Sequence, residues 1–245
     1  MSHFQPGSGF FVCNLLLMKI FFGICRDSKM TQRILLLFIL SSSIVGCSQK
    51  FQDVGVTVEQ SVWGAEDVVV ADERLQKLPY ASLYARVAQG PQIHMVLAYA
   101  DTLSGQSSVE LKWVAQGRAM IVTEGGRITK TLAMPVNNLA EVTTQQYPFG
   151  SDTPVSWQAT YDWQPGYRYG YKATITRRLV GSESVDTPLQ QFTTNHYIET
   201  VYFQVLDTGF ENHFWVDRDG RVIKTIQHIG PDMSSIELLL IRDFG

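Results

Sequence analysis

The residue whose surroundings predict the most definite chemistry is Cys47, the last residue of the sequence Ile-Val-Gly-Cys at positions 44–47. An apolar run from Ile34 to Leu40 precedes it, and Arg33 precedes that run. A basic residue, an apolar stretch and small residues before a cysteine are typical of a bacterial lipoprotein signal peptide. The thiol would be the nucleophile that accepts a diacylglycerol. We therefore predict that Cys47 is the lipid-attachment residue and that residues 30–46 are the signal peptide.

The length of this signal peptide favours a start of translation at an internal methionine, Met30, instead of Met1. A signal peptide that begins at Met1 would have 46 residues, whereas one that begins at Met30 has 17, and signal peptides usually have about 15–30 residues. We expect translation to start at Met30 and residues 1–29 to be an upstream extension. The alternative is that the apolar stretch Phe10–Ile24, which two polar residues interrupt, is a second anchor.

The charge and cysteine content of the expected mature chain limit the kinds of molecule that it can bind and the cross-links that it can form. Residues 47–245 contain 16 basic and 22 acidic residues, a net charge of −6, and Cys47 is the only cysteine among them. An acidic chain without a basic cluster is unsuited to bind nucleic acid or to be held electrostatically on anionic lipid. We expect the lipid on Cys47 to be the membrane contact, and we expect no disulfide.

The pattern after Cys47 predicts a tether over residues 47–65 and one β-rich domain over residues 66–245. Runs of β-branched and aromatic residues, often alternating with polar ones, are typical of strands. They cover residues 94–100, 110–116, 119–124, 127–132, 167–180, 192–206, 212–217, 221–229 and 235–241. Residues 133–153 are predicted to be a connection. A short helix is predicted over residues 71–77, with Asp72 as its cap and Pro79 after its end.

Two turns predict antiparallel pairing. Gly125-Gly126 and Asp219-Gly220 each lie between strand patterns and suit two-residue hairpin loops. Two predicted strands, 167–180 and 192–206, have ten or more residues, and long antiparallel strands favour a strongly twisted sheet. The predicted fold class is all-β and mainly antiparallel, with long curved strands in an open barrel or sandwich and one or two short helices.

The titratable residues give no catalytic pattern. The histidines after Met30 are His94, His196, His213 and His228, which lie far apart in the sequence and outside any HExxH helix. No Gly-x-Ser-x-Gly motif is present. We therefore predict no catalytic residues, no metal ligands and no cofactor. A glycosidase would need only two carboxylates brought together by folding, so a periplasmic carbohydrate-active enzyme is kept as an alternative.

Aromatic residues gather around one predicted turn, Gln164-Pro165-Gly166. They are Tyr161, Trp163, Tyr167, Tyr169 and Tyr171. Aromatic rings at a loop tip can stack on the apolar faces of sugars, but aromatic residues on strands are also common in cores. We predict core positions for Tyr169 and Tyr171. Trp163 and Tyr167, beside the turn, are the candidate binding residues, with the core as the alternative.

An ordered set of short segments resembles one family, the group 4 capsule polysaccharide lipoproteins (GfcB/YjbF). The resemblance covers most of residues 68–240, and the lipidation motif lies where that family has one. The matching segments are Leu78-Pro79-Tyr80-Ala81-Ser82, Trp113-Val114, Gly126-Arg127 with Lys130-Thr131, Asn138-Leu139, Phe214-Trp215-Val216-Asp217, Gly220-Arg221-Val222, Gln227 and Gly230-Pro231.

The resemblance implies a periplasm-facing lipoprotein of exopolysaccharide or capsule export. We expect a non-catalytic accessory or assembly factor that binds a protein of the export machinery or the polysaccharide itself. Ser48 follows the cysteine in place of the aspartate that retains enterobacterial lipoproteins at the inner membrane, so we expect the outer membrane. A lipid or lipoprotein carrier with an apolar cavity is a further alternative.

Overall fold

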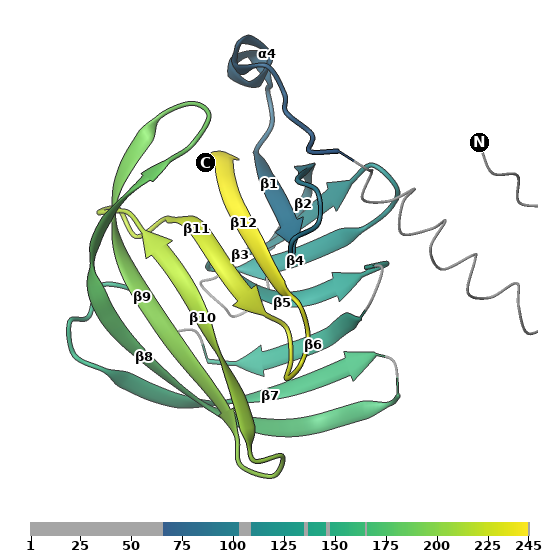
Figure 1. The fold of residues 1–245 in the computed structure, drawn as a ribbon, viewed down its shortest axis with the longest axis vertical. Coiled ribbons are helices and arrows are strands. Elements are labelled where there is room, and N and C mark those ends of the chain that lie inside the picture. The colour runs from purple at the N-terminus through teal and green to yellow at the C-terminus, as the bar shows by residue number, and fades with distance from the viewer. Residues whose placement is uncertain (1–65, 103–108, 135–136, 146–147, 165, 245) are drawn as a thin grey trace, which may run out of the picture. The chain divides into compact units, whose positions relative to one another are not determined.

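The described chain is almost entirely antiparallel β-sheet (Figure 1). The computed structural model describes residues 66–244, apart from 103–108, 135–136, 146–147 and 165. Within these residues, one helix, α4 (Asp72–Lys77), precedes twelve strands. The strands are β1 (Ser82–Val87), β2 (Ile93–Thr102), β3 (Val109–Ala115), β4 (Met120–Glu124), β5 (Arg127–Leu132), β6 (Asn138–Thr144), β7 (Val155–Gln164), β8 (Arg168–Asp186), β9 (Gln191–Phe203), β10 (Thr208–Val216), β11 (Val222–His228) and β12 (Ser235–Arg242). The predicted fold class is confirmed.

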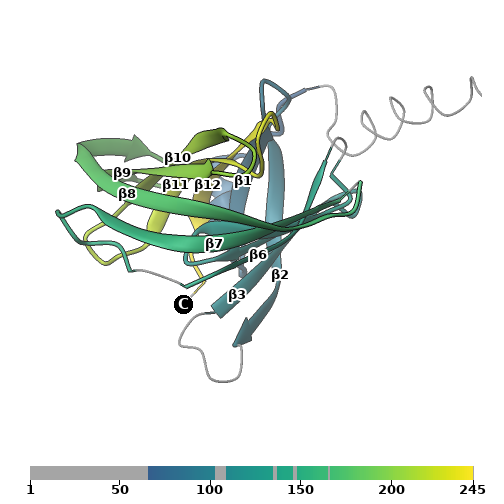
Figure 2. The same cartoon turned by 90° about the horizontal axis from the view of Figure 1, so that it is seen from below.

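All twelve strands belong to one sheet. Its order is β5-β4-β3-β2-β1-β12-β11-β10-β9-β8-β7-β6, so the first and last strands pair in the middle and the edge strands are consecutive in the chain. The sheet curves strongly (Figure 2), and its edge strands β5 and β6 lie side by side (Figure 1). There the Leu139 amide of β6 donates a hydrogen bond to Thr131 Oγ1 of β5 at 2.9 Å. The result is a nearly closed, barrel-like sheet, the open-barrel form of the prediction.

The interior of this sheet is filled by side chains. β7 shows the pattern most clearly, since Trp157, Ala159, Tyr161 and Trp163 are buried and alternate with more exposed residues. Apolar side chains from the other strands join them in one cluster. Fully burying a large apolar side chain contributes about 1.5–3 kcal/mol. The interior is therefore a packed core and supplies much of the folding free energy.

Parts of the outer face are also covered. A bulge between Trp215 and Val216 lets Trp215 and Ile223 pack together on that face, where Val185 of the β8–β9 hairpin covers them. Beside them, Leu75 of α4 packs against Tyr84 and Ile241. The helix and the hairpin thus form a partial second layer over the middle of the sheet.

Several local predictions differ from the structure. β6 (Asn138–Thr144) lies inside the segment predicted as a connection, and β1 and β7 were not predicted. The helix is capped by Ala71, with no side-chain hydrogen bond, so Asp72 begins the helix instead of capping it. Residues 1–65, with the predicted signal peptide and tether, lie outside the described residues. Among the described residues, no helix has the length and hydropathy to cross a bilayer.

The two predicted hairpin turns form, with one change of length. Gly125 and Gly126, both at positive φ, join Glu124 to its partner Arg127 as a two-residue loop. The turn after β10 has three residues instead of two, because Asp217 N–H donates to the Arg221 carbonyl across residues 218–220. Gly220, with a φ of 83°, supplies the left-handed residue that three-residue loops require.

Candidate functional site

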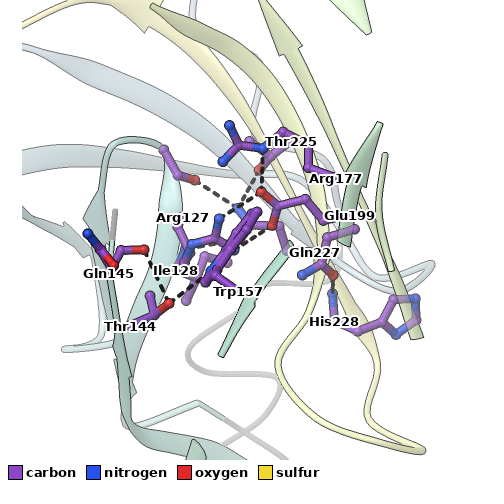
Figure 3. A network of polar contacts seen from close by, with 12 residues as sticks. Arg127, Ile128, Thr144, Gln145, Trp157, Arg177, Glu199, Thr225, Gln227 and His228 are labelled. Atoms are coloured by element: carbon purple, nitrogen blue, oxygen red, sulfur yellow. Dashed lines mark hydrogen bonds and ion pairs between the residues drawn. The ribbon is translucent and has the colours of Figure 1, made fainter. Parts of the chain in front are cut away.

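A buried ion-pair triad lies inside the barrel (Figure 3). Glu199 of β9 accepts hydrogen bonds from Arg127 Nη1 at 2.5 Å, Arg127 Nη2 at 2.7 Å and Arg177 Nε at 2.9 Å. Glu199 is 0% exposed, and each arginine is 4% exposed. The ring of Trp157 lies 5.7 Å and 5.0 Å from the two guanidinium carbons. β5, β8 and β9 are thus tied together by charges that water does not reach.

The triad has the electrostatics of a structural site. Burial alone would raise the pKa of Glu199, but the charges and hydrogen bonds of Arg127 and Arg177 outweigh it and hold the pKa below its usual range. A carboxylate kept ionised in this way cannot serve as a general acid near neutral pH. The charged groups bound to Glu199 are both arginines, which neutralise it as a structural ion pair does, whereas a glycosidase needs one of its two carboxyl groups to act as an acid. The triad therefore does not form the enzyme site that the alternative requires.

Gln227 of β11 adds a second tie across the interior. Its Nε2 donates to the Gly126 carbonyl at 2.8 Å, and its Oε1 accepts from the Ile128 amide at 3.0 Å. Gly126 also lies so close to β11 that an added Cβ would be 2.6 Å from Val222. The β4–β5 hairpin is therefore fixed against β11. The sequence marked Gly126, Arg127 and Gln227 as family-like. The structure shows that Gly126 and Gln227 belong to this junction and that Arg127 belongs to the ion-pair triad.

Two histidines that are distant in the sequence meet on the outer face. His196 Nε2 lies 3.0 Å from His213 Nδ1, and His196 Nδ1 lies 2.9 Å from Glu183 Oε1. Trp215 Nε1 donates to Glu183 Oε2 at 2.9 Å, and its ring stacks on His196 at 4.4 Å. Burial, followed by the charge of His196, lowers the pKa of His213. Among the described residues, no cluster of three or more histidine, cysteine or acidic residues is placed to hold a metal ion.

The two candidate binding residues have different environments. Trp163 is 1% exposed, its indole N–H donates to the Ile229 carbonyl at 2.6 Å, and its ring packs on Phe203 and Tyr171. Its place is therefore in the core, the alternative left open by the sequence, and it offers no face to a ligand. Tyr167 is 88% exposed at the turn, with a φ of 52°. Tyr167 stays a candidate contact.

The predicted core positions after this turn are only partly correct. Tyr171 packs against the main core cluster, but Tyr169 is 54% exposed. The register of β7 and β8 shifts between Tyr161 and Trp163, and Gly170 has a φ of 75°. This local change of pairing breaks the strict alternation from which the core position of Tyr169 was predicted.

An apolar cavity opens between the β4–β5 and β10–β11 turns. It has a volume of about 180 Å³ and is lined by Leu111, Trp113, Val222, Leu238 and Leu240 among others. Sites for drug-sized ligands are about 300–1,000 Å³, so this cavity suits a smaller group than a lipid molecule. Cys47, the predicted lipid-attachment residue, lies outside the described residues.

Comparisons with known proteins agree on one family. The family model described as group 4 capsule polysaccharide lipoprotein gfcB, YjbF matches residues 55–241. The chain is 29% identical over 218 residues to the lipoprotein GfcB of Escherichia coli (strain K12), covering 86% of this chain and 98% of that protein. It is 28% identical over 215 residues to the lipoprotein YjbF of the same strain, covering 84% and 96%.

A solved structure shares the fold. The crystal structure of the hypothetical lipoprotein YmcC from Escherichia coli (K12) superimposes with a TM-score of 0.64 at 25% identity, over 81% of this chain and 97% of that one. Together with the family match over most of the described β-domain, this confirms the resemblance read from the sequence. The chain belongs to the group 4 capsule polysaccharide lipoprotein family (GfcB/YjbF), and it is accordingly a lipid-anchored, membrane-associated protein of a capsule-related process.

Proposed function

We propose that this protein is a non-catalytic accessory or assembly factor in the export of exopolysaccharide or capsule. It would be anchored in the outer membrane by the lipid on Cys47 and face the periplasm. The observation that carries the proposal is the family match over residues 55–241, which includes nearly the whole β-domain. The expected partners are a protein of the export machinery and, through exposed residues such as Tyr167, the polysaccharide.

The geometry of the described residues supports a binding role over the two alternatives. The buried carboxylate Glu199 is neutralised by two arginines, which does not suit the enzyme. The interior is filled with side chains, and the apolar cavity is about 180 Å³, which does not suit a lipid carrier. A rigid, packed barrel with turns and grooves on its surface is a scaffold for contacts with other molecules.

Deletion of the gene tests this role. We expect the deletion strain to lose surface polysaccharide, as measured by staining and by hexose assay of shed polymer, and the wild-type gene to restore it. Cytoplasmic sugar-nucleotide pools should be unchanged, because a lipoprotein exported from the cytoplasm acts after precursor synthesis. Normal surface polysaccharide in the deletion strain, or depleted sugar nucleotides, would contradict the proposal.

A further inference from the structure

A groove of about 470 Å³ opens where β1 begins and β12 ends. Its sides include three exposed aromatic residues, Tyr80, Tyr99 and Phe244, which are 44%, 65% and 48% exposed. Exposed aromatic rings gathered around one concave site are typical of ligand-binding sites. The turn at Tyr167, by contrast, keeps its tryptophan in the core.

The groove exists because β2 is longer than β1. The last backbone hydrogen bond between these strands runs from the Leu97 amide to the Ala81 carbonyl at 3.0 Å. Beyond it, residues 99–102 pair with β3 alone among the described residues. β1 separates β2 from β12 in the sheet, so its absence here leaves a notch between the two strands. The notch offers backbone polar groups beside the aromatic rings.

The charges of the groove are balanced. Among the described residues that line it, Arg242 is the cation and Asp243 the anion. Arg242 Nη2 donates to the Gln76 carbonyl at 2.7 Å and thereby caps the end of α4. Asp243 Oδ2 lies 3.7 Å from Arg221 Nη1. With one charge of each sign and no excess of either, the groove suits an uncharged ligand.

We propose that this groove binds a neutral segment of polysaccharide. A sugar ring has an apolar face of C–H bonds and a rim of hydroxyls, which match aromatic rings and strand-edge backbone groups, respectively. The volume also falls within the range of about 300–1,000 Å³ that is typical of ligand sites. The proposal rests on the proposed role in polysaccharide export and names the surface that contacts the polymer.

An extended peptide that adds a strand to β2 is the competing occupant. Two features of the edge disfavour it: the free stretch is short, and a register shift between Leu97 and Tyr99 distorts its start. Short, bulged edges are how proteins discourage strand addition. We therefore assign the groove to the glycan and treat peptide binding as an outcome of the test.

The test is calorimetric titration of the mature lipoprotein, purified in detergent, with oligosaccharides cleaved from the surface polysaccharide of the bacterium that encodes it. Wild-type protein should bind, and Tyr99→Ala and Phe244→Ala should each bind about tenfold more weakly, which corresponds to about 1.4 kcal/mol. Tyr202→Ala is the matched control, since it removes an exposed tyrosine outside the groove lining, and should bind as the wild type does. Raising NaCl from about 0.1 M to about 1 M should change the affinity little.

The outcomes separate the proposals. Absence of wild-type binding, unchanged affinity of Tyr99→Ala, or loss of binding in Tyr202→Ala alone would overturn the glycan assignment. Capture of a protein partner that Tyr99→Ala abolishes, without glycan binding, would assign the groove to a peptide. None of these results would alter the deletion phenotype, so failure of the groove assignment is distinguishable from failure of the export role.

Discussion

Replacement of Glu199 by glutamine tests how the barrel is held together. The substitution keeps the size of the side chain but removes the charge that both buried arginines share. Removing one partner of a buried ion pair costs about 3–5 kcal/mol, because it leaves an uncompensated charge away from water. Here two guanidinium groups, each 4% exposed, lose their counterion, so we expect at least the upper part of that range.

This loss is large compared with the whole stability of a domain, which is about 5–15 kcal/mol. In a domain of about 150–250 residues, each kcal/mol shifts Tm by about 2–4 °C, so a loss of about 4–5 kcal/mol should lower Tm by about 8–20 °C. Urea unfolding followed by tryptophan fluorescence gives the free energy directly. The matched control is Asp101→Asn, which removes the half-exposed partner of Lys112 and should cost about 0–1 kcal/mol.

A triple variant, Arg127→Met with Arg177→Met and Glu199→Leu, separates charge from packing. Replacing a whole buried ion-pair cluster by apolar residues is often neutral or stabilising, so the triple variant should be more stable than Glu199→Gln. The reasoning would be refuted if Glu199→Gln cost no more than Asp101→Asn, or if the triple variant were less stable than the single one.

Three further predictions follow from other features. Cys47→Ser should give an unlipidated precursor, since a serine oxygen cannot form the thioether; labelled palmitate in the variant would contradict this. Trp163→Ala should lower the free energy of unfolding by about 3–5 kcal/mol, whereas Tyr167→Ala should change it by no more than about 0.5 kcal/mol; equal effects in urea unfolding would refute the burial argument. The lowered pKa of His213 gives stability that is complete above the unfolded pKa of about 6.5 and declines as the pH falls through the folded pKa. Lowering the pH from about 7 to about 5.5 should therefore decrease the midpoint of urea unfolding less in His213→Asn than in the wild type. An equal decrease in both proteins would exclude His213 as a source of this pH dependence.

Local signals in the sequence predicted much of the fold. Runs of apolar and β-branched residues located β2, β3, β5 and β12 within a residue or two of their observed bounds. The glycine pair 125–126 gave its hairpin because a tight two-residue loop needs positive φ. These features depend on neighbouring residues alone and are therefore visible without the tertiary structure.

Features that depend on register could not be predicted in this way. Arg127 and Glu199 are 72 residues apart, and nothing in either strand marks its partner. Tyr169 is exposed because the pairing shifts beside it, and bulges leave little trace in the alternation. The groove beside Tyr99 arises because β2 extends beyond the residues that pair with β1. This is a relation between two strands, and the sequence of neither strand shows it.

The central claim is that this lipid-anchored barrel acts in polysaccharide export. The most direct measurement is the amount of surface polysaccharide in the deletion strain complemented with wild-type protein or with Cys47→Ser, each at matched periplasm-accessible levels. We predict full restoration by the wild type and little or none by the unlipidated variant, with sugar-nucleotide pools unchanged in both. Equal restoration by both proteins would contradict a role at the membrane, and a deletion strain with normal surface polysaccharide would contradict the export role itself.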